Sequence, residues 1–422
     1  AAGIDFHSDM NPVLLKPEST IGSQIILNGK KYKSLKAREY YFHKEKFLAV
    51  AIKSFRNLLN KFDLVIAEGA GSLAEVNLRK SDIANMGFAT ELGIPVIVVA
   101  DIERGGVIAQ IIGTKEVLDQ KDINLIEGFV INKFRGDQSL FDDGVAFINN
   151  KTDWKSFGVM PFFDKAKLFP AEDSQDLKNS FGTGKCVISV LKLSRIANFD
   201  DFDPLKIDKR LKLTFVEAGS PIPADTNLII IPGTKSTIAD LNFLKCQGWD
   251  IDIRAHLRRG GFILGICGGF QILGNEITDD QGYDGIPSNA KGLGLLDVQT
   301  IMGKEKNLGK KEFISTVNGK KISGYEIHLG ITSGNDCNKP FATLRERKDG
   351  AISSNGLVMG TYLHGLFFSD EFRNKFVTKI SGNEKEENVY FNDNIDSILE
   401  EFVNVLEENL DVDSMLSTAR NI

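Results

Sequence analysis

The sequence has little cysteine and no excess of positive charge. Only four of its 422 residues are cysteine, at positions 186, 246, 267 and 337, and no two have C-x-x-C spacing. This argues against a zinc site and a disulfide framework and fits a reducing cytoplasm. The formal net charge is -6. A chain without a broad basic field is a poor partner for nucleic acid, although a few local cations still allow an anionic small molecule to bind.

Long hydrophobic runs are also missing. No apolar stretch approaches the roughly 18 residues that a membrane-spanning helix needs, and the N-terminus lacks a signal-peptide pattern. We therefore expect a cytoplasmic protein with small-molecule partners and no membrane or nucleic-acid partner. The length and a hydrophobic content of 42% suffice for two domains.

Short runs rich in Val and Ile occur in two series, and helical patterns lie between the runs. Buried parallel strands have this pattern, so each series predicts a doubly wound α/β domain. The predicted strands are 63–67, 94–99 and 126–131 in the first series, and 186–193, 211–216, 227–233 and 261–266 in the second.

A polar connector at 163–185 separates the two series, which places a domain boundary near residue 184. The predicted domains are 1–183 and 184–380, followed by a tail and helix over 381–422. In that tail, apolar residues recur at helical spacing between Ile395 and Leu406, which indicates a docked terminal helix or, alternatively, a partner-binding helix.

The segment GGFILGICGGFQILG (260–274) places Cys267 between a predicted strand and a predicted helix. Gly265 and Gly269 flank the cysteine with the spacing of a nucleophile elbow, a sharp turn that exposes the reactive atom. The start of the following helix favours a thiolate. A free cysteine is often only a small buried hydrophobe, and we interpret the other three cysteines that way. For Cys267 we predict a nucleophile.

A thiolate nucleophile needs a base, and the sequence has five histidines. His364 lies at the end of a strand-like run in GLVMGTYLHGLF, and His328 has a similar setting in GYEIHLG. The residues alone favour His364 but leave both candidates open. Upstream, IIIPGTKST (229–237) ends a strand in a glycine turn, which is either an ordinary strand-to-helix turn or a source of a free N–H for an oxyanion.

Polar side chains follow three strand-like runs in the N-terminal half. Glu68 follows the first run, Asp101 and Arg104 the second, and Asn132 the third. Strand-end carboxylates commonly cap helices, but three polar strand ends in succession indicate a ligand crevice at the carboxyl edge of a parallel sheet. A carboxylate at the position of Glu68 can bind Mg2+ on nucleotide phosphates.

The motifs PGTKST, GICGGFQILG, GYEIHLG and GTYLHGLF, in this order, resemble the class I glutamine amidotransferase domain of the cobyric acid synthase family. The resemblance implies that Cys267 is the nucleophile, that His364 is its base, and that Gly233 and Gly268 form the oxyanion pocket. Many such glutaminases have a glutamate two residues after the histidine, where this chain has Leu366. The partner that orients the histidine is therefore unassigned.

The N-terminal half, with DMNPVLLKP, DLVIAEGAGS and GFVINKFRGD, resembles the dethiobiotin-synthetase-like P-loop domain of the same family. The resemblance implies that Glu68 binds Mg2+, that Asn132 contacts adenine, and that Asp101 and Arg104 lie near the acid substrate or the metal. It also implies ATP and Mg2+ as substrate and activator, with no permanently bound prosthetic group.

The resemblance further implies amidation of the b, d, e and g carboxylates of adenosylcobyrinic acid a,c-diamide. A sister ligase, such as cobyrinic acid a,c-diamide synthase, is the closest alternative. The sequence lacks the P-loop motif G-x-x-x-x-G-K-[ST], and the nearest segment, GTGKC (182–186), lies in the connector. We expect that this chain lacks the N-terminal segment that carries the motif; a non-catalytic corrinoid- or glutamine-binding protein is the alternative.

Overall fold

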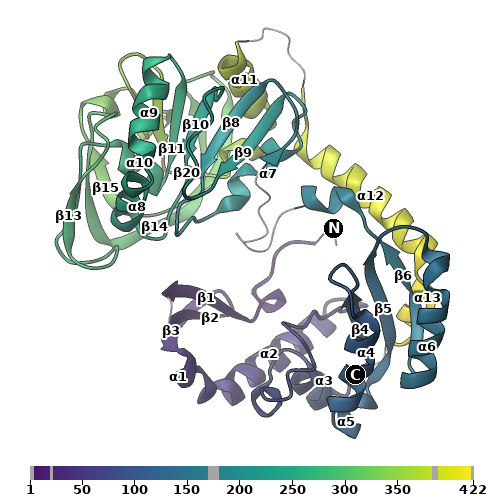
Figure 1. The fold of residues 1–422 in the computed structure, drawn as a ribbon. Helices are drawn as coiled ribbons and strands as arrows, with labels where there is room; N and C mark the ends of the chain where they lie inside the picture. The colour runs from purple at the N-terminus through teal and green to yellow at the C-terminus, as the bar shows by residue number, and fades with distance from the viewer. Residues whose placement is uncertain (1–3, 20–21, 170–179, 383–387, 420–422) are drawn as a thin grey trace. The chain divides into compact units, whose positions relative to one another are not determined.

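The chain divides into two compact units in a computed structural model that describes residues 4–19, 22–169, 180–382 and 388–419 (Figure 1). One unit comprises residues 1–164 together with 398–422, and the other comprises 165–397. Part of the predicted connector, 170–179, lies outside the described residues. The division into units describes which parts of the chain are compact and does not define domain limits. The limits predicted at residues 183 and 380 therefore stay predictions.

The first unit contains two small sheets. One is antiparallel, in the order β1-β2-β3, and the other is parallel, in the order β4-β5-β6. The elements of this unit are β1 (Val13–Ser19), β2 (Gly22–Leu27), β3 (Lys30–Lys36), α1 (Ala37–Tyr41), α2 (Lys44–Leu59), α3 (Met86–Leu92), β4 (Val96–Asp101), α4 (Val107–Val117), α5 (Gln120–Ile123), β5 (Ile126–Phe134), α6 (Asp142–Thr152), β6 (Lys155–Pro161) and α13 (Val412–Ser417).

The parallel sheet forms the core of this unit. Phe129 and Ile131 of β5 are fully buried and cluster with apolar side chains from β4 and the neighbouring helices. Each such side chain contributes about 1.5–3 kcal/mol by leaving water. The register pairs Asp101, the last residue of β4, with Asn132 of β5. The strands predicted at 94–99 and 126–131 are thereby confirmed, and their polar ends lie at one edge.

The strand predicted at 63–67 is wrong. These residues form no helix or strand, and Ile66 has 84% of its surface exposed. The apolar run has the composition of a strand, but a strand also needs a hydrogen-bonded neighbour. The described chain pairs β4 with β5 and pairs no strand with the other edge of β4. The apolar composition of residues 63–67 was therefore not sufficient to predict a strand correctly.

The second unit combines a mostly parallel sheet with a second, mixed one. Its elements are β7 (Ser180–Phe181), β8 (Cys186–Leu191), α7 (Asp203–Lys206), β9 (Leu211–Val216), β10 (Leu228–Ile231), α8 (Thr237–Cys246), α9 (Trp249–Arg258), β11 (Phe262–Ile266), α10 (Gly268–Leu273), β12 (Glu276–Asp279), β13 (Ser288–Lys291), β14 (Gln299–Ser315), β15 (Lys321–Ser333), β16 (Ala342–Leu344), β17 (Arg347–Asp349), β18 (Ala351–Ile352), β19 (Val358–Thr361), β20 (Leu363–His364) and α11 (Asp370–Ser381).

The main sheet of this unit has the order β18-β19-β11-β10-β8-β9-β7. Strands β8 to β11 and β19 are parallel to one another, and β10 and β11 consist almost entirely of buried Ile and Leu. The four predicted strands of the second series are confirmed as β8, β9, β10 and β11. The α/β fold class is likewise confirmed, with mixed rather than purely parallel sheets.

The second sheet contributes β15 and β20 to the neighbourhood of β11. Strand β20 pairs with β15, and the register sets His364 opposite Tyr325. A single residue, Tyr362, separates β20 from the end of β19, which itself pairs with β11. The chain therefore brings His364 from one sheet close to the end of the strand that precedes Cys267.

The apolar stripe near the C-terminus forms a helix, as predicted. Helix α12 (Phe391–Asn409) includes the stripe, and its Ile398 is buried. The ring centroids of Phe402 and Phe163 are 5.0 Å apart. Within the described residues, no helix combines the length and the apolar character that crossing a membrane requires.

Candidate functional site

Cys267 stands in a sharp turn between β11 and α10. Its backbone angles are φ 53° and ψ -111°, a conformation that L-residues rarely adopt. Such a conformation costs about 1–3 kcal/mol and persists only when the surroundings enforce it. The N–H of Cys267 donates to the carbonyl of Thr361 at 2.8 Å, which ties the turn to β19. This strained strand-to-helix turn is the predicted elbow.

The flanking glycines are required by close packing. A Cβ on Gly269 would lie 2.0 Å from the carbonyl oxygen of Ile231, and one on Gly265 would lie 2.6 Å from the backbone of Gly269. No other residue fits at either position without moving backbone. The two glycines therefore allow α10 to pack directly on the strand ends that present Cys267.

His364 is oriented by a buried carboxylate, that of Asp201. Nδ1 of His364 lies 2.7 Å from an oxygen of Asp201, and the N–H of Gly365 donates to the second oxygen at 2.6 Å. Both side chains are only 1% exposed. The carboxylate fixes the ring orientation and leaves Nε2 for other partners. Asp201 is therefore the orienting partner that the sequence left unassigned.

The surroundings favour the charged form of His364. Burial alone lowers the pKa of the imidazole, but the carboxylate of Asp201, its hydrogen bond and the side chain of Cys267 outweigh burial and raise the pKa to about 10. The interaction with Cys267 identifies His364 as a histidine within reach of the thiol. An imidazolium beside a thiol stabilises the thiolate.

An aromatic ring covers the histidine. Tyr325 stacks on His364 with ring centroids 5.4 Å apart and an angle of 20° between the planes. Its hydroxyl accepts a hydrogen bond from the amide of Asn198 at 2.7 Å. Burial, with the nearby Asp201, raises the pKa of Tyr325, so this ring remains a neutral wall of the site.

The glycine turn after β10 approaches the same centre. A Cβ on Gly233 would lie 2.7 Å from Cε1 of His364, and a Cβ on Gly268 would lie 2.5 Å from the methyl of Thr234. Gly268 is the first residue of α10, so its N–H has no partner within the helix. The structure thus brings together Cys267, His364, Gly233 and Gly268, the four residues predicted for this site.

Asp240 of α8 secures this glycine turn. Its buried carboxylate accepts hydrogen bonds from the hydroxyls of Ser194 and Thr234 and, at 3.2 Å, from the N–H of Arg195. The loop after β8 is thereby fixed against the turn after β10, and the N–H of Ala197 donates to the carbonyl of Gly233 at 2.8 Å. A backbone fixed in this way is preorganised for an oxyanion.

His328 has different surroundings. Its ring stacks on Tyr362 with centroids 3.7 Å apart, and burial lowers its pKa to about 4. The thiol of Cys267 donates to the carbonyl of the preceding residue, Ile327, at 3.5 Å. His328 is therefore a neutral, packed ring on the strand beside the nucleophile. The carboxylate of Asp201 contacts His364 instead.

In the first unit, polar side chains meet at the ends of β4 and β5, as predicted. Nζ of Lys133 lies 2.7 Å from Asp101, and the side chain of Asn132 accepts a hydrogen bond from the N–H of Lys133. The bond from Lys133 lowers the pKa of Asp101, and the charge of Arg104 adds to this effect. The structure thus brings together Asp101, Arg104 and Asn132.

Glu68 lies in the irregular segment that follows residue 62. No hydrogen bond or ion pair joins Glu68 to Asp101 or Asn132 in the described part of the chain. The turn after it is ordered by Asn85, whose side-chain amide both accepts from the N–H of Ala70 at 3.0 Å and donates to its carbonyl at 2.8 Å. No local pattern in the sequence pointed to Asn85, because it contacts Ala70 from fifteen residues away.

The carboxylates of Glu68 and Asp101 are suited to a metal ion that takes most of its ligands from a nucleotide. Among residues 4–19, 22–169, 180–382 and 388–419, no group of three or more His, Cys, Asp or Glu side chains is arranged to hold an ion. Mg2+ usually takes one or two carboxylates and completes its shell with phosphates and water. The exposed carboxylates of Glu68 and Asp101 are compatible with that use.

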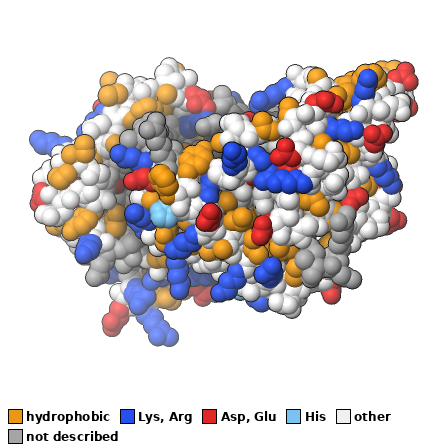
Figure 2. All heavy atoms as spheres, turned by 90° about the horizontal axis from the view of Figure 1, so that it is seen from below, with side chains coloured by type: hydrophobic (Ala, Val, Ile, Leu, Met, Phe, Trp, Pro, Cys, Tyr) orange, Lys and Arg blue, Asp and Glu red, His pale blue; other side chains and the backbone are white. Residues whose placement is uncertain are grey.

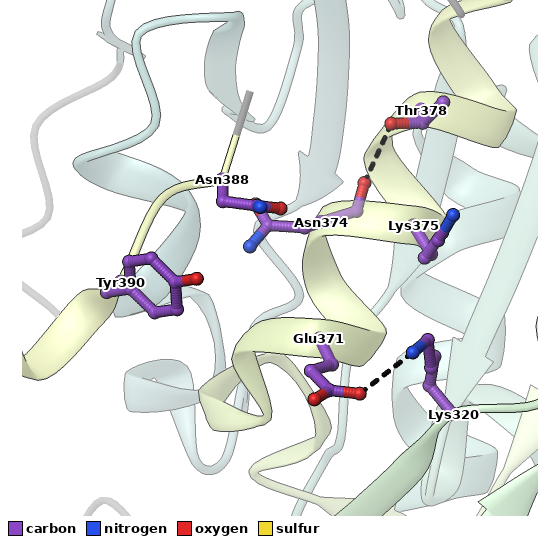
Figure 3. Close-up of a pocket in the computed structure, with 7 residues that line it drawn as sticks. All are labelled: Lys320, Glu371, Asn374, Lys375, Thr378, Asn388 and Tyr390. Carbon is purple, nitrogen blue, oxygen red and sulfur yellow. Dashed lines mark hydrogen bonds and ion pairs between the residues drawn. The ribbon is translucent and has the colours of Figure 1, made fainter. Parts of the chain in front are cut away.

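A separate pocket lies beside α11 and is distinct from the site at Cys267 (Figure 3). Its lining residues are Lys320, Glu371, Asn374, Lys375, Thr378, Asn388 and Tyr390. Nζ of Lys320 lies 3.0 Å from Glu371, and the hydroxyl of Thr378 donates to the carbonyl of Asn374 (Figure 3). None of the predicted site residues lines it, so we assign it no part in the chemistry.

Comparison with known proteins matches two families along the chain. Residues 187–372 match the CobB/CobQ-like glutamine amidotransferase domain, and residues 32–167 match an AAA domain. The first match contains Cys267, His364 and Asp201, and the second contains Glu68, Asp101 and Asn132.

Whole-length relatives extend this result. A cobyric acid synthase of Bradyrhizobium diazoefficiens is 50% identical over 423 residues, which cover all of this chain and 87% of the relative. A cobyric acid synthase of Cereibacter sphaeroides is 49% identical, with the same coverage. That of Rhodobacter capsulatus is 48% identical, again over the full chain.

Proposed function

This chain belongs to the cobyric acid synthase family, and from that membership we propose the reaction that its two units perform. It is a glutamine-dependent amide ligase that amidates carboxylates of a cobyrinic acid in cobalamin biosynthesis. The specific substrate that we propose is adenosylcobyrinic acid a,c-diamide, amidated at its b, d, e and g carboxylates to adenosylcobyric acid. Because the nucleophilic thiol must stay reduced, we place the reaction in the cytoplasm.

The ammonia comes from glutamine in the second unit. The thiolate of Cys267 attacks the side-chain amide carbon, and the resulting oxyanion is stabilised by the N–H groups of Gly233 and Gly268. Protonated His364 gives its proton to the leaving nitrogen, ammonia departs, and a thioester remains. Water, deprotonated by His364, then releases glutamate and restores the thiol. The 2.7 Å contact between His364 and Asp201 is the observation that carries this proposal.

The ammonia is consumed in the first unit. A corrinoid carboxylate attacks the γ-phosphate of ATP, which gives an acyl phosphate and ADP. Ammonia then attacks the acyl carbon, phosphate leaves with the bonding electrons, and the amide loses a proton. We assign Asn132 to adenine and Asp101 and Arg104 to the acid or the metal. Their meeting at one sheet edge supports this assignment.

When Mg2+ is bound with ATP, it would neutralise negative charge on the phosphates. We assign Glu68 as its carboxylate ligand in this chain. The turn that Asn85 orders beside Glu68 supports this role, because it holds the backbone next to the carboxylate in one conformation.

The proposed function is tested by product analysis with separate corrinoids. The full-length gene product that contains this chain is incubated with glutamine, MgATP and either cobyrinic acid or adenosylcobyrinic acid a,c-diamide, and products are identified by mass spectrometry and NMR. We expect amides at b, d, e and g of the a,c-diamide. Amidation only at a and c would instead identify a sister ligase. Corrinoid binding without any amide product would support a binding protein.

A further inference from the structure

Helix α2 carries a row of cations on its solvent side. Lys46, Lys53 and Arg56 are exposed and recur at helical spacing, with Ala49 and Ile52 between them. We call these five residues the basic stripe. Neither Lys53 nor Arg56 forms an ion pair with any acidic side chain that the structure describes.

The basic stripe lies in a basic segment of an otherwise acidic chain. Residues 30–56 contain nine Lys and Arg against two Glu, whereas the whole chain has a net charge of -6. Nζ of Lys46 sits 4.2 Å from the ring centre of Tyr32, which connects the stripe to the lysine-rich strand β3. Figure 2 shows Lys and Arg side chains interspersed with hydrophobic ones on the face that it draws.

The stripe also lines an open hollow. Ala49, Ile52, Lys53, Arg56 and Asn57 of α2 line it together with Glu91 of α3, and its volume is about 440 Å³. Ala49 and the half-buried Ile52 add apolar surface to this lining beside Lys53 and Arg56. Glu91 is the one acidic group among these lining residues, and it disfavours a second carboxylate close to it.

We propose that the basic stripe binds the non-reacting carboxylates of the corrinoid substrate, an inference that rests on the proposed function. The corrinoid is a broad ring with apolar faces and several peripheral carboxylates, and it complements a surface on which apolar side chains lie beside unpaired cations. An enzyme that amidates four different carboxylates must bind the same ring in several orientations. Flexible lysine head groups on an open surface accept such rotations, whereas a closed pocket would select one.

The charge on the ligand then determines how long it stays bound. Each amidation replaces a carboxylate by a neutral amide, so the attraction to Lys53 and Arg56 weakens with every turnover. The least amidated corrinoid binds most tightly, and the finished product is released.

The test measures corrinoid binding directly, by equilibrium dialysis with visible absorbance, using cobyrinic acid a,c-diamide and the full chain at low salt. The double variant Lys53→Gln/Arg56→Gln should raise Kd roughly tenfold, with a smaller effect at high salt. Glu91→Gln should lower Kd about twofold. The matched control is Lys121→Gln/Lys151→Gln, which removes two exposed lysines from α5 and α6 and should leave Kd unchanged. Circular dichroism verifies that each variant is folded.

The possible outcomes distinguish a failure of the proposed binding site from a failure of the proposed function. Equal Kd values for the stripe and control variants would overturn the site, as would an equally large loss for a corrinoid whose b, d, e and g groups are already amides. If the unmodified chain binds neither corrinoid, the proposed substrate is wrong, whatever the variants do.

Discussion

The two strand edges that carry the candidate chemistry differ in how far the protein itself completes them. At the end of β11, Cys267, His364 and Asp201 are buried within one unit, and a hydrogen bond joins His364 to Asp201. At the ends of β4 and β5, Asp101 and Lys133 are each more than 40% exposed and pair with one another. The first edge is completed by the protein's own side chains, whereas the second is exposed and open to a ligand.

The difference follows from the chemistry that each edge must perform. A thiolate needs a fixed proton donor and a preorganised oxyanion site, and burial strengthens both. A nucleotide site must exchange a large charged ligand at every turnover, so its groups stay hydrated and bind through exposed charges. Substitutions should therefore act strongly at the first edge and weakly at the second.

Replacing the nucleophile tests the first edge most severely. Cys267→Ser should reduce glutamate release from glutamine at least about a thousandfold, because the hydroxyl is far harder to ionise than the thiol. Ammonia-dependent amidation should persist, since it bypasses this centre. Loss of both activities would show that the comparison is wrong and that Cys267 serves the synthetase edge or the fold.

Removing the charge that orients the base should have the next largest effect. Asp201→Asn should lower kcat for glutamine hydrolysis about a hundredfold or more, because the amide neither fixes the tautomer nor stabilises the imidazolium. The matched control is Asp200→Asn, which removes the adjacent carboxylate but leaves the 2.7 Å contact to His364 intact. Similar losses in both variants would argue against a specific role for Asp201.

The same pair predicts a pH dependence of stability. The folded pKa of His364, about 10, lies above its ordinary value of 6.5, so the native state retains the proton longer than the unfolded state. This contribution is fully present below pH 6.5 and is lost as the pH rises toward 10. Thermal unfolding should therefore show a falling Tm over that window, and the fall should be smaller in Asp201→Asn.

Crowding the glycine turn should have an intermediate effect. Gly233→Ala would place a methyl 2.7 Å from Cε1 of His364, so the ring or the turn must move, and glutamine hydrolysis should fall about tenfold or more. Gly303→Ala is the matched control, because a Cβ there meets no atom within 4 Å. Steady-state kinetics of both variants would measure the difference; unchanged kinetics of Gly233→Ala would show that the turn is not tightly fixed.

The smallest effect is expected at the exposed edge. Asp101→Asn should reduce ammonia- and ATP-dependent amidation about tenfold, leave glutamine hydrolysis unchanged and alter the free energy of unfolding by less than about 1 kcal/mol, because exposed ion pairs contribute little. Glu103→Gln is the control, since Glu103 pairs with Arg135 at similar exposure. A large loss of stability in Asp101→Asn would show that the edge at β4 and β5 also depends on fixed contacts within the protein, which contradicts the proposed difference between the two edges.

The sequence predicted those features that depend on neighbouring residues. The glycines and strand around Cys267 lie within a few positions of it, so their pattern was sufficient to predict the elbow. Asp201 was missed because it lies 163 residues before His364 and meets it only in the folded unit. The segment 63–67 was predicted wrongly for the opposite reason. Its local composition suits a strand, but no neighbouring strand pairs with it.

The separation of Asp201 from His364 has a consequence during synthesis of the chain. The ribosome produces Asp201 and Cys267 long before His364, which joins β15 through the late strand β20. A nascent or prematurely terminated chain therefore has the thiol of Cys267 without the ring of His364. Under the proposed mechanism such a fragment cannot hydrolyse glutamine, because the proposed proton donor is added only with β20.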